Sequence, residues 1–341
     1  HEGQKYRPVD ADSLLPYREA SDGQILQEGI CEVGAMASFM AAGSAYAVHG
    51  LPMIPFYIFY SMFGMQRVGD MVWGCADMMC KGFLLGGTAG RTTLNGEGLQ
   101  HQDGHSHVLA STVPSLLSYD PAFGYELAII VREGLRRMYV EQEDIFYYLT
   151  LYNENYLMPD MADVLARGAL TQDQLVQGVL DGGYCFDPAQ SEADIHLLAS
   201  GSILQQAIRA KAELQALGYE VSLWSMTSYV ELQRDAFAVA AANRQNPQAP
   251  AQVSKVEAMF DDASGAIIAV TDYMASLAQG IAAWMPAGYE VLGTDGFGLS
   301  ESRAALRAHF EVDADAIVSA ALANLYGQGL IDEEKLNAAN R

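Results

Sequence analysis

The sequence predicts an α/β protein with two doubly wound, mainly parallel sheets. Its 341 residues allow two domains of roughly 150 residues each, and half of the residues are hydrophobic, which is enough for a large core. Short apolar segments alternate with amphipathic segments of helical length in two successive runs. Such alternation is typical of parallel sheets that are covered by helices on both faces.

The first run follows a polar lead-in over residues 1–22. A segment rich in Gly, Ala and Met has helical spacing over 30–48, and the short aromatic segment 51–60 predicts a buried strand. Residues 89–107 form a long loop rich in Gly, Asn and His, which in a compact domain is typical of a functional or disordered segment. The other predicted elements of this run are helices over 61–83 and 122–139 and strands over 84–88, 114–119 and 145–152.

The second run follows a connector that has helical character in its middle. Gly218 is a stop signal for the helix before it. The predicted strands cover 195–199, 219–226, 266–271 and 290–292, and the predicted helices cover 202–217, 228–244, 274–285, 302–310 and 314–326, with a short one from 333.

The charge and the apolar segments narrow the class of partner. Lys and Arg total 19 against 42 Asp and Glu, so the formal charge is −23, which argues against nucleic acid and anionic membranes as partners. The longest apolar candidate, 51–65, is interrupted by two prolines and a serine, so no transmembrane helix is predicted. The negative field favours solubility and a basic protein partner.

The cysteines and the first residues indicate the compartment. None of Cys31, Cys75, Cys80 and Cys185 forms a CxxC pair, which is typical of buried thiols in a reducing compartment. The opening HEGQKYRPVD has no basic or apolar region of a signal peptide, so we expect a cytoplasmic protein. A start at His1 also leads us to expect a piece of a longer chain.

Two features of the first run carry side chains that structure alone does not require. Glu32 lies in the small, apolar segment GICEVGA, where a carboxylate is costly unless it is paired or faces solvent. The second feature is an aromatic series that either packs in the core or stacks on a planar ligand, and it consists of Phe56, Tyr57, Phe59, Tyr60 and Phe63.

The loop NGEGLQHQDGHSH holds three histidines and two carboxylates, which are Glu97, His101, Asp103, His105 and His107. A solvated loop, a zinc site and a proton-transfer site remain open, although the spacing is not that of a common zinc motif. Imidazoles suit proton transfer near neutral pH. Three glycines and little apolar anchoring predict a mobile loop.

Long segments of the chain resemble the homodimeric bacterial pyruvate dehydrogenase first component, a thiamine diphosphate-dependent enzyme of the transketolase superfamily. The resemblance extends from about residue 20 to about residue 330 and is specific, because the matching segments are long and uninterrupted. They are GQILQEGICEVGAMASFMAAG, LPMIPFYIFYSMFGMQRVGDM, GRTTLNGEGLQHQDGHSH, YNENYLMPDM, LLASGSIL, VTDYM and VLGTDGFGLSESR.

The resemblance implies roles for four residues. Glu32 stands at the position of the family glutamate that contacts the pyrimidine ring nitrogen of the cofactor, and Phe63 where the family stacks an aromatic ring on the aminopyrimidine. Tyr60 matches an active-site tyrosine that faces the substrate. His101 matches the active-site histidine, which orients the pyruvate carboxylate or assists proton transfer.

Other residues of the His-rich loop have less clear counterparts. Glu97 and His107 are weaker candidates, and Gln102 stands where some relatives are expected to have an acidic residue.

The resemblance also implies the reaction and the partners. It is decarboxylation of a 2-oxo acid, pyruvate before others, followed by reductive acetylation of a lipoyl group on the dihydrolipoyl acetyltransferase component. The cofactors are thiamine diphosphate and Mg²⁺, and the protein is a homodimer. In such a reaction the protein orients the substrate, excludes water from the pocket and provides proton relays.

The expected domains are a pyrimidine-binding domain over 1–165, truncated at its N-terminus, a connector over 166–190, and a transketolase C-terminal-like domain over 191–341. The family's diphosphate-binding half carries GDG followed by a paired-Asn metal motif. None of VGDM, LDGG and TDGFG is followed by such a pair, so the Mg²⁺ and diphosphate ligands are expected outside this chain. The GTDGFG turn is interpreted as a structural strand-to-helix connection.

Two kinds of function remain open. In the first, the chain is part of an active dehydrogenase component and works only with the missing half, so that the isolated chain is inactive. In the second, it is a non-catalytic module that dimerises or docks. A first component for another 2-oxo acid is a variant of the first.

Overall fold

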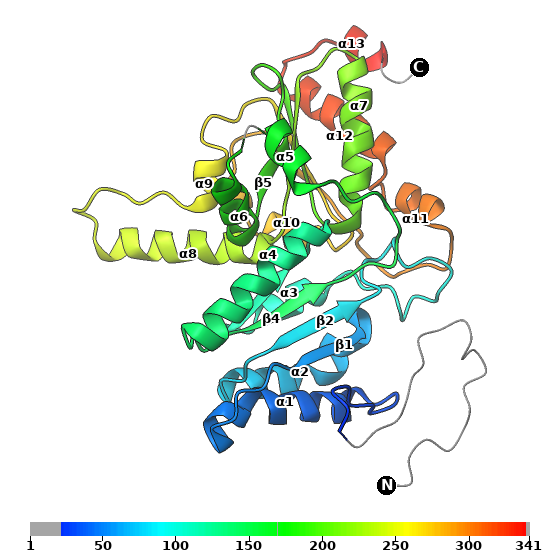
Figure 1. Cartoon of the computed structure of the whole chain (residues 1–341). Coiled ribbons are helices and arrows are strands. Elements are labelled where there is room, and N and C mark those ends of the chain that lie inside the picture. The colour runs from blue at the N-terminus through cyan, green and yellow to red at the C-terminus, as the bar shows by residue number, and fades with distance from the viewer. Residues whose placement is uncertain (1–21, 169, 339–341) are drawn as a thin grey trace.

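The computed structural model describes residues 22–168 and 170–338 as two α/β units, one above the other in the view of Figure 1. The predicted lead-in lies, apart from residue 22, outside the described residues. The predicted fold class, two mainly parallel sheets with helices around them, is confirmed.

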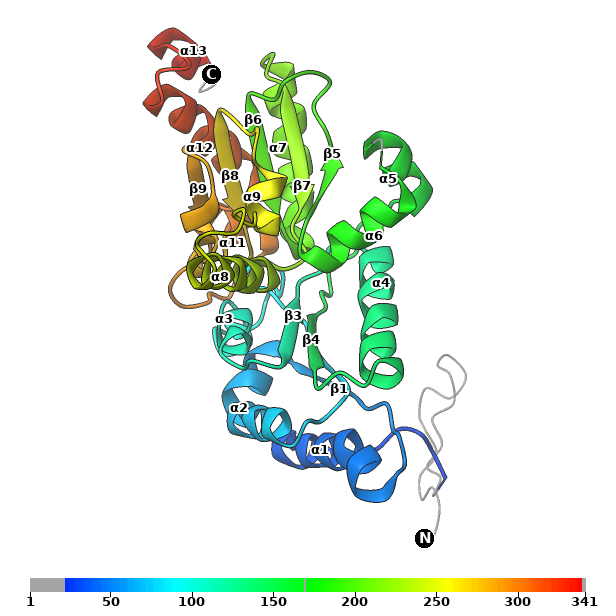
Figure 2. The same ribbon diagram turned by 90° about the vertical axis from the view of Figure 1, so that its left-hand side faces the viewer.

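The first unit holds a four-stranded parallel sheet in the order β1-β2-β4-β3. Figure 2 shows α2 and α3 on one side of this sheet and α4 on the other. The strands are β1 (Phe56–Tyr60), β2 (Phe83–Gly87), β3 (Leu116–Tyr119) and β4 (Phe146–Thr150), and the helices are α1 (Glu32–His49), α2 (Ser61–Asp77), α3 (Ser106–Ser111) and α4 (Gly124–Leu135), the last continued by a π-helical turn, η1 (Arg136–Val140).

Two predicted elements of this unit are corrected. The segment 51–60 was expected as a buried strand, but only its second half is a strand, and β1 lies at the sheet edge, pairing with β2 alone among the described residues. Phe56, Ile58 and Tyr60 are therefore 49%, 67% and 48% exposed. The helix expected to reach residue 83 ends at Asp77, because the chain turns through a left-handed Met79 before β2 begins.

The second unit holds a five-stranded sheet in the order β5-β7-β6-β8-β9, parallel except for β5. Its strands are β5 (Tyr184–Asp187), β6 (Ile195–Ala199), β7 (Val221–Ser225), β8 (Ala266–Val270) and β9 (Tyr289–Leu292). Its helices include α7 (Leu204–Ala216), α8 (Tyr229–Gln245), α9 (Lys255–Met259), α11 (Arg303–His309), α12 (Ala314–Gly327) and α13 (Glu333–Ala338).

Two features of the second unit differ from the sequence prediction. The helix expected over 274–285 is broken into α10 (Ser276–Gln279) and a 3-10 turn, η3 (Ala282–Trp284), with Gly280 between them, since glycine is a poor helix former. The connector predicted over 166–190 contains α6 (Gln172–Asp181) and β5, which joins the second sheet; α5 (Met161–Gly168) precedes them.

The central strands of the second sheet are buried on both faces. Alternate residues of β6 and β8 belong to two different hydrophobic clusters: Leu197 and Ile268 pack with α7 and α12, whereas Leu198 and Ile267 pack with α8 and α9. The continuous apolar character of these strands is the usual mark of a doubly wound sheet. It also explains why their positions were predictable from the sequence.

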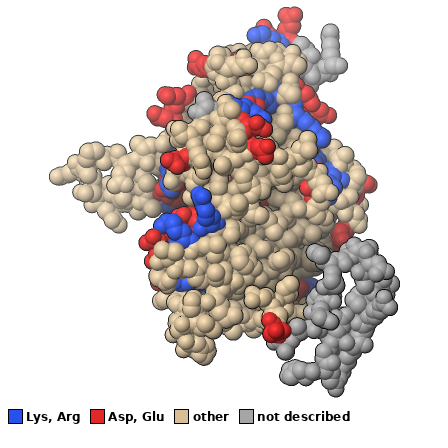
Figure 3. Space-filling view, viewed as in Figure 1, with Lys and Arg blue, Asp and Glu red and all other residues tan. Residues whose placement is uncertain are grey.

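No helix in the described part of the chain is both long and apolar enough to span a bilayer. On the face shown in Figure 3, charged side chains are scattered over the upper unit, and few lie over the lower unit around α1 and β1. The exposed aromatic and aliphatic side chains of β1 belong to this lower unit.

Candidate active site

The structure brings three of the predicted site residues, Tyr60, Phe63 and His101, into one cluster and links the fourth, Glu32, to it through Arg67. Glu32 is the first residue of α1, Tyr60 ends β1, and Phe63 lies in the first turn of α2. His101 comes from the loop after β2, and its ring stands edge-on to both aromatic rings, with centroid distances of 5.5 Å to Tyr60 and 4.8 Å to Phe63. The carboxyl ends of β1 and β2 thus carry the cluster, as parallel sheets commonly do.

Arg67 connects Glu32 to this cluster. Its guanidinium donates to Glu32 Oε1 at 2.7 Å, and its Cζ lies 4.2 Å from the centre of the Phe63 ring. The Glu32 side chain is 19% exposed. The carboxylate is therefore paired rather than isolated, which removes the cost that its sequence context implied.

The His101 imidazole is held next to a second carboxylate. Its Nδ1 lies 3.2 Å from Glu97 Oε2, within ion-pair distance, but this buried nitrogen has no hydrogen-bond partner within the described residues. The His101 backbone N–H donates to the Gly98 carbonyl at 3.0 Å and closes a tight turn around the ring. Nδ1 is thus a buried nitrogen beside a carboxylate and without a hydrogen bond among the described residues.

The start of the loop that carries His101 is anchored in the second unit. Asp272, which follows β8, accepts the backbone N–H and the hydroxyl of both Thr92 and Thr93, over 2.5–3.1 Å. Burial raises the pKa of Asp272, and Arg307 and the two threonines act in the opposite direction. Arg307 also pairs with Glu154. The loop thus starts from a buried polar joint between the two units.

The solvated-loop interpretation is wrong for the inner half of the segment. Gln102, Asp103 and His107 are buried. Asp103 accepts the N–H groups of His105 and Ser106, at 3.0 and 2.9 Å, just before and at the first residue of α3. His107 bonds Ser118 and Thr150 through its two ring nitrogens, at 2.6 and 2.9 Å, so it belongs to the core rather than to the cluster.

Sequence reasoning missed Arg67 and Gln66, two residues of α2, and the contacts that they make. Arg67 follows Phe63 by one helical turn, a spacing that places both on one side of α2. The other contact joins Gln66 Nε2 and His105 Nε2 at 2.6 Å. No local signal predicts it, because it joins α2 to the loop across 39 residues.

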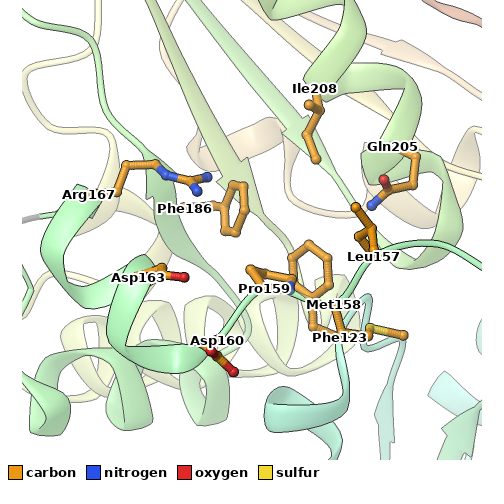
Figure 4. Close-up of a pocket in the computed structure, with 10 residues that line it drawn as sticks. All are labelled: Phe123, Leu157, Met158, Pro159, Asp160, Asp163, Arg167, Phe186, Gln205 and Ile208. Atoms are coloured by element: carbon orange, nitrogen blue, oxygen red, sulfur yellow. The ribbon is translucent and has the colours of Figure 1, made fainter.

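The four predicted site residues neither belong to a possible metal site in the described part of the chain nor line the hollow between the two units. Within residues 22–168 and 170–338, no group of three or more His, Cys, Asp or Glu side chains could hold a metal ion. A hollow of about 450 Å³ lies between the units, and Figure 4 shows its lining, with the Arg167 side chain beside Phe186. None of the four predicted site residues lines it.

Comparisons with known proteins agree with this architecture. Residues 1–159 match the pyruvate dehydrogenase E1 component middle domain, and residues 182–313 match the transketolase-like C-terminal domain. Transketolase from Leishmania mexicana has a TM-score of 0.65 at 18% identity, covering 88% of this chain and 37% of its own. At that identity the likeness shows the fold, so the chain is a pair of transketolase-like α/β domains.

Relatives in sequence narrow this class further. The chain is 51% identical to the pyruvate dehydrogenase E1 component of Pseudomonas aeruginosa, over 97% of this chain and 37% of that protein. It is 48% identical to the same component of Escherichia coli K12, over 97% of this chain and 36% of that protein. The chain belongs to the pyruvate dehydrogenase E1 component family, and it spans about a third of the length of these relatives.

Proposed function

We propose that the chain supplies the pyrimidine-binding side of a thiamine diphosphate-dependent pyruvate dehydrogenase active site. The observation that carries this proposal is the convergence of three separate segments, which bring His101 against Tyr60 and Phe63 and join Glu32 to them through Arg67. An acid, aromatic rings and an imidazole at one place suit a planar, nitrogen-containing ring and a carboxylate substrate.

The residues present fit the aminopyrimidine half of the cofactor. Tyr60 is half-exposed, Phe63 is partly exposed, and the Nδ1 of His101 has no hydrogen-bond partner within the described residues. Arg67 covers one face of the Phe63 ring and holds Glu32. A ring that stacks on Phe63 therefore uses the other face or displaces Arg67, and release of Arg67 frees the Glu32 carboxylate for a ring nitrogen.

Each residue has a stated role in this proposal. Glu32 holds or gives a proton at a pyrimidine ring nitrogen, Phe63 stacks on the ring, Tyr60 faces the substrate, and His101 orients the pyruvate carboxylate or moves a proton. Thiamine diphosphate, when bound, acts as the electron sink for loss of CO₂. Its diphosphate and Mg²⁺ are held by residues outside this chain.

The complete reaction in this proposal is decarboxylation of pyruvate and reductive acetylation of a lipoyl group. The partners are a second copy of the chain and the dihydrolipoyl acetyltransferase component, and the location is cytoplasmic. The identity of 51% and 48% to two E1 components supports pyruvate as the 2-oxo acid. The domain limits 1–165, 166–190 and 191–341 are retained as the working division of the chain.

The test combines cofactor binding with complementation. The chain alone is titrated with thiamine diphosphate and Mg²⁺ while the circular dichroism of the aminopyrimidine is followed, and again with the N-terminal portion of an E1 relative. We expect pyruvate-dependent dye reduction only with both parts. Tight Mg²⁺-dependent binding by the chain alone would contradict the placement of the diphosphate site.

Glu32→Ala is expected to abolish the restored activity, because it removes the carboxyl that is proposed to hold or give a proton at the pyrimidine ring nitrogen. Glu28→Ala is the matched control, since Glu28 is exposed and lies just before the same helix. Persistent activity in Glu32→Ala would reject the assigned role.

The unmutated, complemented enzyme is also assayed with pyruvate and with a branched 2-oxo acid. No activity with either acid would favour the non-catalytic docking module. Turnover of only the branched acid would mean that the substrate is not pyruvate.

A further inference from the structure

Gln102, the neighbour of His101, joins the loop to the second unit. Its side chain is fully buried. The amide Nε2 donates to the Leu94 carbonyl at 2.8 Å, and Oε1 accepts the Leu299 backbone N–H at 2.6 Å. Leu94 lies near the start of the same loop, whereas Leu299 lies 197 residues away, after β9. One planar side chain, next to His101 in the sequence, thus bridges the start of the loop and the turn after β9.

Gly298 permits this close approach. A Cβ built on Gly298 would lie 2.4 Å from Gln102 Oε1 and 2.8 Å from Gln102 Cβ, distances that no side chain tolerates without movement of Gln102. Two backbone bonds support the same junction: Gly96 N–H donates to the Glu301 carbonyl at 3.1 Å, and Met274 N–H donates to the Gly104 carbonyl at 2.7 Å. His101 therefore lies between two points at which the second unit holds the loop.

We propose that Gln102 is a positioning residue that places the His101 ring against Tyr60 and Phe63 by bonding to the Gly298–Leu299 turn. The bridge needs one donor and one acceptor on the same rigid group, which an amide supplies and a carboxylate does not. The GTDGFG segment is thus more than a strand-to-helix connection, because it holds the loop of the candidate active site. The inference that Gln102 places His101 does not depend on the proposed function. Only the effect of this placement on catalysis rests on the proposed function.

The first test is the magnetic resonance spectrum of the histidine ring protons in the 341-residue chain. In the native protein we expect the two neighbouring aromatic rings, at centroid distances of 5.5 and 4.8 Å, to shift the His101 resonances. Gly298→Ala displaces the Gln102 amide without adding a charge, and Gln102→Glu removes its donor. In both variants we expect the His101 resonances to move toward those of the exposed His49, while those of the buried His107 stay in place.

The matched control is Gln100→Glu. Gln100 is exposed, lies in the same loop and gains the same charge as Gln102→Glu. We expect it to leave the His101 resonances unchanged. Unchanged His101 resonances in Gly298→Ala and Gln102→Glu would overturn the proposal, as would an equal shift in Gln100→Glu.

The second test is hydrogen–deuterium exchange at single amides. Loss of the bridge is expected to speed exchange at the Leu299 and His101 amides by at least about tenfold. The Thr92 and Thr93 amides, which are held by Asp272, keep their rates. Faster exchange throughout strands β6 and β8 in both variants would show global unfolding and would assign Gln102 to stability instead of placement, which also overturns the proposal.

These outcomes separate the inference from the proposed function. The magnetic resonance and exchange experiments need neither cofactor nor substrate, so they stand if the chain proves inactive. In the complemented enzyme, a positioning role predicts a lower kcat for Gly298→Ala with a smaller change in cofactor binding, because the Phe63 and Glu32 side chains keep their places.

Discussion

At the scale of single residues, the candidate site divides into what a local pattern indicates and what only a fold creates. Glu32 and the His-rich loop could be picked out because an acid in an apolar segment and a cluster of imidazoles are unusual by themselves. The choice of His101 within that loop depended on the family resemblance. The contacts of Arg67 and Gln102 could not be predicted, because their partners lie 35 and 197 residues away. A common residue type such as Arg or Gln indicates a role in a site only when the structure shows its hydrogen-bond partners.

His107 gives the residue-scale prediction. Burial lowers the pKa of this imidazole, although Asp120 and Asp103 act in the opposite direction. Below a pH of about 6.5 the unfolded chain therefore takes up a proton that the folded chain does not, and the free energy of unfolding falls as the pH falls. Between pH 7.5 and 5.5 we expect His107 to account for a loss of up to about 1 kcal/mol.

Urea unfolding of the native chain and of His107→Gln at both pH values measures this loss. The glutamine variant does not titrate, so its stability should decrease less over the same interval. An equal decrease in both proteins would show that His107 does not titrate differently in the folded and unfolded states.

At the scale of elements, periodicity predicted most helices and strands to within a few residues. The prediction from periodicity was wrong where the position of a strand in the sheet differs from what its residue types indicate. The apolar segment 51–60 was expected to be buried, but β1 lies at an edge. Strand β5 was missed because its alternating pattern is short and it pairs antiparallel with β7. Position within a sheet is a tertiary property that no local pattern contains.

The cap of helix α8 gives the element-scale prediction. Ser228 accepts the Glu231 N–H at 3.0 Å and donates to the Ser118 carbonyl of the first unit at 2.5 Å, and it is buried. Ser228→Ala removes the cap and leaves a buried carbonyl unpaired, so we expect a loss of about 2–3 kcal/mol in thermal or urea unfolding.

Ser302→Ala is the comparison for this loss. Ser302 caps α11 through the Ala305 N–H at 3.4 Å and is exposed. We expect its replacement to cost about 1 kcal/mol or less. A similar loss in both variants would mean that the contact with Ser118 adds nothing to the cap.

At the scale of the whole molecule, the two units share one packed and hydrogen-bonded junction. The buried Glu126 accepts from Tyr184 and Ser225, both at 2.7 Å, and the rings of Phe123 and Phe186 lie 5.2 Å apart. Burial raises the pKa of Glu126 against these hydrogen bonds. One hydrophobic cluster contains residues of both units. The units should therefore unfold together.

Asp272→Ala tests this coupling. Its removal takes the acceptor from four buried donors of Thr92 and Thr93, although the Thr93 hydroxyl still has Ser202 Oγ at 2.5 Å. We expect this to cost about 3 kcal/mol. In the native chain, the fluorescence of Trp73 in the first unit and of Trp224 in the second should follow one urea transition. In the variant we expect the two transitions to separate, measured in single-tryptophan backgrounds.

The control for this change is Asp262→Ala, at an exposed aspartate just before β8. We expect it to keep one transition with a shift below about 0.5 kcal/mol. Coincident transitions in Asp272→Ala would show that the apolar contacts alone couple the units.

By itself the sequence determined the two runs of alternating elements and the doubly wound fold, because residue type and spacing act locally. The candidate set of Glu32, Tyr60, Phe63 and His101 was predicted from the resemblance to the E1 family and not from spacing. Only the tertiary structure decided that β1 is an edge strand, that Arg67 holds Glu32, and that Gln102 bonds the Leu299 turn. These depend on which segments meet in space, and a hydrogen bond exists only where both partners are brought within about 3 Å.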